Sequence, residues 1–268
     1  MTHYWRFQSL KLPRDLEELG VRTQVFEKAE SDQSTRVEPV SDSVTLVFGL
    51  GSSWTFSNIE GDSLHTNAAL FGPMCNPQRV INDDIGRCLE ISLPPWLASE
   101  IFSPELVSTP SPLSIAGEFD AETKAIVEAV TNSPDLETTT ATLIGFLTER
   151  QAAKERVTRT EVQWAWDRLT DRQPVTVKSL ARQIGWSERH FENVYSDAIG
   201  CSPKRSSRLA RFSLAHQMLL NNSVSMAEVS AASGYYDQSH MIRNFREFAG
   251  LTPKQVREQE AQHRVITG

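Results

Sequence analysis

Two stretches near the carboxy-terminal end of the sequence place side chains that hydrogen-bond to base edges at helical spacing. In the first, Arg189, Glu192, Asn193 and Ser196 recur at i, i+3, i+4 and i+7, which puts them on one face of a helix. In a DNA major groove, Arg pairs with guanine O6 and N7, Asn pairs with adenine, and Glu accepts from cytosine N4. The chemistry expected of this face is recognition of a base sequence.

The second stretch carries a comparable set on its outward face. Gln238 is suited to adenine, Arg243 to guanine, and Ile242 to a thymine methyl group, with Ser239 beside them. Taken singly, each of these residues is more typical of a merely solvated helix face, so base contact is expected only because of the repeat described next. Phosphate contacts, which fix register without carrying base information, are expected from one histidine and six nearby cations: Lys204, Arg205, Arg208, Arg211, His240, Arg246 and Lys254.

The two stretches belong to an internal repeat. The segment GCSPK at 200–204 matches GLTPK at 250–254, an offset of 50 residues. Upstream, Gly185–Trp186 matches Gly234–Tyr235 at an offset of 49, because one residue is inserted in the second copy. Recurrence of turn glycine, helix core and helix start together is typical of a duplicated supersecondary unit.

Each copy predicts a helix, a tight turn and a second helix. In the first copy, a helix over 177–184 is followed by Gly185, which can adopt the positive φ of a sharp helix exit. Ser187 then serves as N-cap of the second helix. Gly234 and Asp237 take the equivalent places in the second copy. This order is that of a helix-turn-helix, whose second helix enters a major groove.

A long helix is predicted between the two copies. Ser202 is suited to cap it, Pro203 occupies the favoured first position, and its pattern ends near Leu220. About 17 residues at ~1.5 Å each would span roughly 25 Å. That length is of the order of the ~34 Å between adjacent major-groove segments. One chain is therefore expected to place two recognition helices on DNA without dimerising.

With these features together, residues 158–258 resemble the DNA-binding domain of the AraC/XylS transcription regulators. The strongest stretch is ASGYYDQSHMIRNFREFAGLTP, which runs from Ala232 to Pro253. In that family the positions of Arg189, Glu192 and Asn193 commonly face bases, although arginine is more usual where Asn193 stands. In the amino-terminal half, VTLVFGLG and ALFGPM resemble sensor domains of a bacterial branch of the family. The resemblance implies bacterial origin, promoter binding and a regulatory amino-terminal domain.

The charge distribution supports a division into two domains. The 268 residues carry a net charge of −7, which by itself argues against nucleic-acid binding. Residues 1–150, however, hold 10 basic and 22 acidic residues, and residues 151–268 hold 17 and 12. The halves are thus −12 and +5, so only the second is suited to a polyanion. We expect a sensor, effector or dimerisation domain over 1–150 and a DNA-binding domain over 151–268, with helix-turn-helix units at about 177–196 and 227–248.

An α+β fold is expected, in which a small antiparallel β-sheet or barrel with helices precedes an all-α half. VTLVFGL at 44–50 and WTF at 54–56 flank a Gly-Ser-Ser turn, as in a hairpin. Glu27–Pro39 is polar and is predicted as a surface loop. Further strands are expected at 68–71, 78–81 and 87–93, and helices at 95–102, 119–131 and 135–156.

Catalytic chemistry finds little support in the sequence. His65, Cys75 and Cys88 could converge on a metal, but they lack CxxC or HxH spacing, so no metal site is predicted. No GxSxG, phosphate-binding loop or dinucleotide fingerprint occurs, so neither a catalytic residue nor a cofactor is predicted. The tryptophans of the second half are expected to pack in the core rather than to stack on single-stranded bases: Trp164, Trp166 and Trp186.

Two hypotheses from different classes follow. The first is a transcription regulator that binds double-stranded promoter DNA, contacts RNA polymerase and responds to a small-molecule effector or a partner, with a homodimer left open. The second is an enzyme with a DNA-targeting module, similar to repair-linked members of the same family. Three scattered cysteines, the polar start MTHYWRFQSL and the lack of a long apolar run favour a cytoplasmic protein without disulfides or membrane segments. No pattern identifies effector-binding residues.

Overall fold

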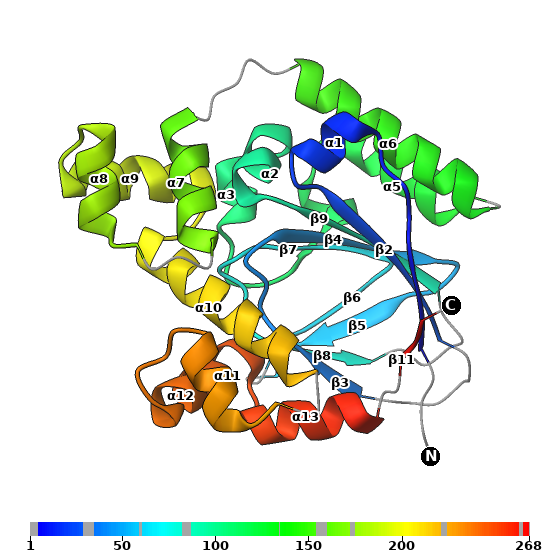
Figure 1. Ribbon diagram of the computed structural model, residues 1–268. Helices are drawn as coiled ribbons and strands as arrows, with labels where there is room; N and C mark the ends of the chain where they lie inside the picture. Colours follow the sequence, from blue (N-terminus) through cyan, green and yellow to red (C-terminus); the bar gives the residue numbers. More distant parts are fainter. Residues whose placement is uncertain are drawn as a thin grey trace.

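The computed structural model describes residues 5–28, 35–58, 61–81, 87–133, 135–153, 160–171, 175–220, 224–262 and 265–267. Two β-sheets with helices around them form the amino-terminal part, and a series of helices follows (Figure 1). The expected α+β architecture, with an antiparallel sheet domain before a helical half, is confirmed. None of the helices in the described ranges is long and apolar enough to cross a bilayer.

The larger sheet has the strand order β10-β7-β4-β9-β2-β1-β11. Its strands are antiparallel, except that β11 pairs with β1 in parallel. Their bounds are β1 (Trp5–Ser9), β2 (Arg22–Lys28), β4 (Val44–Leu50), β7 (Ala68–Phe71), β9 (Arg87–Leu93), β10 (Leu113–Ser114) and β11 (Val265–Thr267).

The smaller sheet has the order β3-β8-β5-β6. It consists of β3 (Thr35–Glu38), β5 (Trp54–Ser57), β6 (Ser63–Thr66) and β8 (Gln78–Ile81). The strands expected at 44–50, 54–56, 68–71, 78–81 and 87–93 are therefore present. The hairpin expected from the first two was wrong, because β4 pairs with β7 and β9 whereas β5 pairs with β6 and β8. The turn between them carries the chain from the larger sheet to the smaller one.

The prediction of a surface loop over Glu27–Pro39 was wrong for the residues that the structure describes at each end of this stretch. Glu27 and Lys28 complete β2, and Thr35–Glu38 form β3; residues 29–34 lie outside the described ranges. The physical reason lies in tertiary contacts. Arg36 pairs with Glu38 at 2.6 Å and with Glu260 at 2.8 Å, so a strand with polar side chains is stabilised by charges that meet only in the fold.

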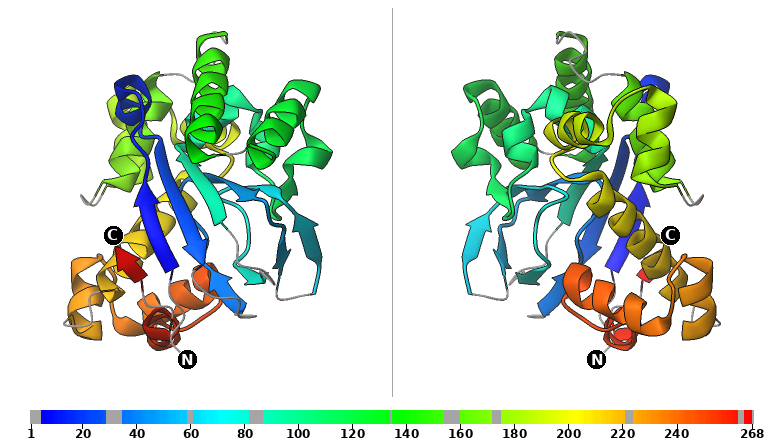
Figure 2. Two further views of the ribbon diagram at one scale, coloured as in Figure 1. Left: turned by 90° about the vertical axis from the view of Figure 1, so that its right-hand side faces the viewer. Right: turned by 90° about the vertical axis from the view of Figure 1, so that its left-hand side faces the viewer.

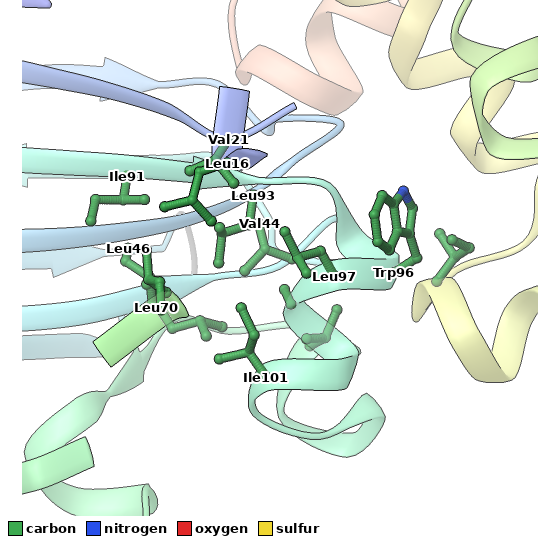
Figure 3. Packing of buried hydrophobic residues seen from close by; sticks show 14 of the residues in the cluster. Leu16, Val21, Val44, Leu46, Leu70, Ile91, Leu93, Trp96, Leu97 and Ile101 are labelled. Atoms are coloured by element: carbon green, nitrogen blue, oxygen red, sulfur yellow. The ribbon is translucent and has the colours of Figure 1, made fainter. Parts of the chain in front are cut away.

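Along β4 and β9, alternate side chains point to opposite faces of the larger sheet, and each face packs in a different hydrophobic cluster. In β9, Leu89, Ile91 and Leu93 belong to the main core beneath the helices, whereas Cys88 packs with Trp54 of the smaller sheet. Figure 3 shows the core side of this sheet, where Leu93 lies near Leu97 of the helix after β9 and Ile91 lies further along the sheet, near Leu16. The larger sheet therefore has one face against helices and the other toward the smaller sheet.

The helices of the amino-terminal part match the sequence expectation closely. Those expected at 95–102, 119–131 and 135–156 are found as α2, α5 and α6, and residues 154–156 lie outside the described ranges. The bounds are α1 (Arg14–Glu18), α2 (Pro95–Ile101), α3 (Pro104–Val107), α4 (Ile115–Glu118), α5 (Ala121–Thr131) and α6 (Leu136–Ala153).

The remaining helices form two groups at opposite ends of α10. Figures 1 and 2 show α7–α9 near the start of α10 and α11–α13 near its end. The bounds are α7 (Thr160–Thr170), α8 (Val177–Ile184), α9 (Glu188–Ile199), α10 (Pro203–Leu219), α11 (Met226–Ala232), α12 (Gln238–Ala249) and α13 (Pro253–Gln262).

The two groups join the amino-terminal part in different ways. Phe191, Tyr195 and Ile199 of α9 lie in the same hydrophobic cluster as Leu97 and Ile101 of α2, so the first group shares the main core. The second group has a cluster of its own, to which the amino-terminal part contributes only Val40 among its buried members. Trp164, Trp166 and Trp186 are partly buried against the main core, as expected of packing residues.

Gly72→Ala is expected to destabilise this arrangement. An added Cβ at Gly72 would lie 2.0 Å from the Val107 carbonyl oxygen, a backbone atom at the end of α3. Because that contact requires the backbone to move, we expect a loss on the order of 1–3 kcal/mol in the free energy of unfolding. The measurement is urea unfolding followed by circular dichroism.

Gly145→Ala is the matched control. No atom lies within 4 Å of an added Cβ at Gly145, which lies inside α6. Alanine is the better helix former by roughly 0.8–1 kcal/mol, so this variant should equal or exceed the wild type. Equal stability of the Gly72 and Gly145 variants would contradict the close contact at α3.

Candidate DNA-binding surface

The first helix-turn-helix is closed at each end by local hydrogen bonds. Thr176 and Ser179 form a capping box at the start of α8, and Gly185 ends the helix at φ 84°. The Ser187 hydroxyl then accepts a hydrogen bond from the His190 amide at 3.3 Å. The helix over 177–184, the left-handed Gly185 and the Ser187 cap are all as predicted from the sequence.

The second unit repeats this construction. Ser225 and Glu228 form a capping box on α11, and Gly234 has φ 72°. The Asp237 carboxylate accepts a hydrogen bond from the His240 amide at 2.6 Å and begins α12. The predicted glycine and cap are confirmed, and α11 begins at Met226, one residue before the expected start of the unit at about 227.

Inner and outer faces of α9 and α12 separate as the periodicity predicts. Phe191 and Tyr195 of α9 are fully buried, as are Phe245 and Phe248 of α12, with Met241 beside them. The predicted base-contacting residues lie on the opposite faces. Six of them are exposed and Ile242 is half-buried: Arg189, Glu192, Asn193, Gln238, Ser239, Arg243 and Ile242.

The residues predicted to contact phosphate fall into two sets. Lys204, Arg246 and Lys254 are exposed, and Lys254 lies 3.7 Å from Glu258 in the next turn of its own helix. The other four are half-buried: Arg205, Arg208, Arg211 and His240. Partial desolvation, together with the positive charges of Arg211 and Arg243, lowers the pKa of His240. Two guanidinium groups, those of Arg211 and Arg243, therefore act on the start of α12.

Arg205 and Arg208 complete the half-buried set and are engaged inside the protein. Arg205 donates from Nε to the Pro73 carbonyl at 2.9 Å, which ties α10 to the amino-terminal part. Arg208 donates to Asn244 Oδ1 at 2.7 Å and forms an ion pair with Glu247. Both guanidinium groups also lie over the Phe248 ring.

Comparison with known proteins assigns this region. Residues 180–259 match the family described as "Helix-turn-helix domain". They form an AraC-type helix-turn-helix domain. The resemblance drawn from Ala232–Pro253 is thereby confirmed.

Curated relatives of the AraC-type domain are regulators. The chain is 29% identical over 86 residues to "HTH-type transcriptional regulator GbdR" of Pseudomonas aeruginosa, which is 32% of this chain and 23% of that protein. It is 30% identical over 81 residues to "Virulence regulon transcriptional activator VirF" of Yersinia enterocolitica, which is 30% of each protein. The chain thus covers less than a third of the length of either relative.

Among solved structures, the likeness extends beyond the AraC-type domain. ToxT from Vibrio cholerae O395 has a TM-score of 0.51 at 10% identity, over 89% of this chain and 97% of that one. A second ToxT structure, bound to (E)-4-(8-methylnaphthalen-1-yl)but-3-enoic acid, has a TM-score of 0.50. At such identities the likeness is one of fold.

Polar contacts attach the second half of the AraC-type domain to the amino-terminal sheets. The Val40 amide donates to the Phe248 carbonyl at 2.7 Å. The Gln259 side chain exchanges two hydrogen bonds of 3.0 Å with the backbone of Val37. Because β3 is the edge of its sheet, Gln259 continues the hydrogen-bonding ladder there. This attachment was not predicted, since Gln259 and Val37 are 222 residues apart.

The amino-terminal part holds the residues considered for catalysis without assembling them. Within the described ranges, no group of three or more His, Cys, Asp or Glu is placed to hold a metal ion, so His65, Cys75 and Cys88 do not form such a group. Burial raises the pKa of the Cys75 thiol to about 11 and also raises that of Cys88. Cys75, Cys88 and Cys201 are free and buried.

A cavity lies between the two sheets and the connecting helix of the AraC-type domain. Its volume is about 950 Å³, and its wall includes Val47 and Glu90 of the larger sheet, Val80 of the smaller sheet and Ser213 of α10. It extends to Gly234 in the turn of the second unit. No local pattern in the sequence predicts this cavity, because its walls come from strands and helices far apart in the chain.

Gly234→Val is expected to damage the second unit. A β-branched residue resists the positive φ found there, and left-handed backbone costs roughly 1–2 kcal/mol for a residue with a Cβ. Thermal unfolding should therefore begin at lower temperature, and DNA affinity should fall because α12 is no longer fixed against α11.

Gly234→Asn provides the graded control, since asparagine tolerates this conformation better than valine does. The asparagine variant should fall between the wild type and the valine variant in both stability and affinity. If both variants behave like the wild type, the turn does not depend on the left-handed residue.

Proposed function

We propose that the chain is a sequence-specific DNA-binding transcription regulator. Residues 151–268 would bind promoter DNA, and residues 1–150 would respond to a small molecule or a partner. One observation carries the proposal: two capped helix-turn-helix units stand at the ends of α10, each with an exposed set of base-compatible side chains. The names of GbdR and VirF agree with this role.

Base contacts in this proposal come from α9 and α12. Arg189 and Arg243 would pair with guanine, Glu192 with cytosine, and Asn193 and Gln238 with adenine. Ser239 and Ile242 complete the α12 face, Ile242 against a thymine methyl group. The 17 residues of α10 correspond to roughly 25 Å, so both units can engage one side of the duplex.

Phosphate contacts would involve the exposed and the engaged cations differently. Lys204, Arg246 and Lys254 are accessible, whereas Arg205 must release the Pro73 carbonyl before its Nε can donate to a phosphate. Arg208 must likewise exchange Glu247 for the nucleic acid. DNA binding and the attachment of the amino-terminal part are therefore coupled through Arg205.

The biological setting follows from the relatives' names and sources. VirF is named a transcriptional activator, and the named relatives are bacterial. We propose activation at a bacterial promoter, with RNA polymerase as the protein partner and the cytoplasm as the location. A small-molecule effector is proposed for the cavity, and ToxT, which shares the fold, has been crystallised with a small organic acid.

The enzyme hypothesis receives no support from the site chemistry. A repair-type mechanism would need a reactive thiol or a metal in the amino-terminal part. A thiolate is the reactive form of cysteine, and burial disfavours it at both Cys75 and Cys88. The regulator hypothesis accounts for the same region as a sensor domain around a cavity.

Selection from a random duplex library, followed by footprinting, tests the proposed function. The expected result is one preferred sequence, protected over two neighbouring major-groove segments by a monomer and over twice that length by a homodimer. Affinity should fall steeply with salt, because phosphate contacts release counterions. Absence of any preferred sequence at moderate salt would overturn the proposal.

Arg243→Ala tests base contact at α12. If Arg243 pairs with guanine, its removal should cost about 1–3 kcal/mol of binding free energy and relax preference at one base pair. Gel-shift titrations against the selected sequence and its single-base variants measure both effects.

Arg14→Ala is the matched control for that measurement. Arg14 is on α1, where it pairs with Glu18, and its side chain is 90% exposed. Its loss should leave affinity and preference unchanged. A uniform loss of affinity over all sequences in the Arg243 variant would assign that residue to a phosphate instead.

Cysteine alkylation tests the enzyme hypothesis. A pKa moved from 9.0 to about 11 lowers the thiolate population of Cys75 at pH 8 about a hundredfold. We therefore expect iodoacetamide to leave Cys75 and Cys88 unmodified in the native chain while it alkylates the urea-unfolded chain fully, as followed by mass spectrometry. Rapid stoichiometric labelling of one native cysteine would revive the enzyme hypothesis.

A further inference from the structure

The wall of the cavity of about 950 Å³ has an apolar region and an acidic region. One region is apolar, where Val47 of the larger sheet meets Phe56 and Val80 of the smaller sheet, with Phe71 nearby. These are the inward-facing positions of their strands. Ligand pockets commonly fall in this size range and combine an apolar lining with a few placed polar groups.

The other region is acidic. Glu90 enters it from β9, Glu38 from β3, and Asp42 from the segment between β3 and β4. Asp171, which follows α7, is on the same wall but lies 3.8 Å from Arg168. Glu38 is paired with Arg36, so Glu90 and Asp42 are the carboxylates to consider.

Neither of these carboxylates has a cationic partner at ion-pair distance among the residues that the structure describes. Glu90 accepts one hydrogen bond, from Ser92 Oγ at 3.4 Å. It lies on the inward face of β9, with Ser92 two residues further along the strand. The ionised form of a carboxylate withdrawn from water without a cation is costly, so a ligand that brings a positive group would be stabilised beside Glu90.

The positive groups on the cavity wall form no ion pair with Glu90 in the part of the chain that the structure describes. Arg22 and Arg211 line the cavity, and Arg211 donates to the Ser207 carbonyl on its own helix. His216 faces Glu38 and Arg36, and burial lowers its pKa, so its ring is neutral near pH 7. With Glu38 and Asp171 paired to Arg36 and Arg168, the wall retains the carboxylates of Glu90 and Asp42 and the guanidinium groups of Arg22 and Arg211. Arg22 acts electrostatically on Asp42, which leaves Glu90 as the carboxylate that a ligand cation would meet.

We propose that this cavity binds a small organic cation with an apolar group, whose ammonium or amidinium is held by Glu90. The apolar group would lie against Val47, Phe56 and Val80. The proposal deepens the effector role and, as an effector site, rests on the proposed function, although binding itself requires no DNA. It also differs in charge from the organic acid found in one ToxT structure.

The electrostatics of Glu90 agree with such a ligand. Burial, and next the negative charge of Glu38, raise the pKa of Glu90 to about 7. Burial likewise raises the pKa of Asp42. A bound cation would favour the ionised form of both groups. The interaction would be strong because the site is shielded from water.

The position of the cavity gives the ligand a route to the DNA-binding helices. Its wall includes Arg211 and His216 of α10, and it reaches Ser233 and Gly234 in the turn before α12. The cavity that holds the ligand is therefore walled by the sheets, the connecting helix and the turn of the second helix-turn-helix unit. The contact by which α10 is tied to the sheets, from Arg205 to Pro73, lies on the same helix.

The test compares two amphiphiles of equal length on the full chain without DNA. Octylammonium, which is cationic at neutral pH, and octanoate are titrated into the protein by isothermal calorimetry below their micelle concentrations. We expect octylammonium to bind at one site and octanoate to bind at least about tenfold more weakly. Octanoate binding as tightly as octylammonium, or no binding of either, overturns the proposal.

Two variants test whether the carboxylate of Glu90 holds the cation. Glu90→Gln keeps the shape of the side chain and removes its charge, so octylammonium affinity should fall about tenfold or more. Glu137→Gln, an exposed change on α6, should leave the affinity unaltered. Unchanged affinity in Glu90→Gln overturns the assignment of the cation to this carboxylate. If that variant does not fold, the wild-type comparison of the two amphiphiles still decides the ligand class.

Failure here is distinguishable from failure of the proposed function. DNA selection is carried out on the same protein without amphiphile. A preferred DNA sequence with no octylammonium binding would retain the regulator and reject the cation site. Octylammonium binding with no preferred DNA sequence would retain the site and reject the regulator.

Discussion

Phe191, Tyr195 and Ile199 turn the inner face of α9 toward Leu97 and Ile101 of α2, so the first helix-turn-helix unit has no separate core. Its hydrophobic side chains leave water only together with those of the amino-terminal part. Gly200, at the end of α9, approaches Val107 and Ser108 so closely that an added Cβ would lie 3.2 Å from the nearest atom. Burial of apolar area is the main stabilising contribution to folding. The apolar contact between α9 and α2 therefore determines where α9 lies, and with it the start of α10.

The second unit is attached in a physically different way. Its core is largely its own, and its links to the sheets are hydrogen bonds and ion pairs, among them Val40 to Phe248 and Arg36 to Glu260. Such contacts have modest net free energies, because water replaces them when they open. The apolar contact therefore holds the first helix-turn-helix unit against the amino-terminal part. The polar contacts leave the second unit easier to release from the sheets. An arrangement of this kind suits regulation through the second unit and α10.

Charge is distributed in agreement with this division. The net charge of −7 combines an acidic amino-terminal half with a basic carboxy-terminal half. In the proposed function the acidic half would contribute nothing to holding a phosphate backbone, so DNA binding would depend on the placement of a few cations on and around α10 and α12. Two of these, Arg205 and Arg208, are occupied by Pro73, Asn244 and Glu247. Inside the acidic half, Glu90 and Asp42 put the same negative charge into a cavity.

The sequence by itself determined the helix-turn-helix units, since their signals are local. Gly185 and Gly234 adopt positive φ, Ser187 and Asp237 cap the helices that follow, and periodicity separated buried from exposed faces, all within a few residues of chain. Only the tertiary structure decided β3, the cavity and the attachment of the two units. Arg36 and Glu260 form an ion pair, and Glu90 and His216 line the same cavity, yet the members of each pair lie far apart in the chain, so no local pattern predicts that they come together. Capping and helical periodicity depend on neighbours three or four residues away, whereas a cavity depends on how whole sheets and helices pack.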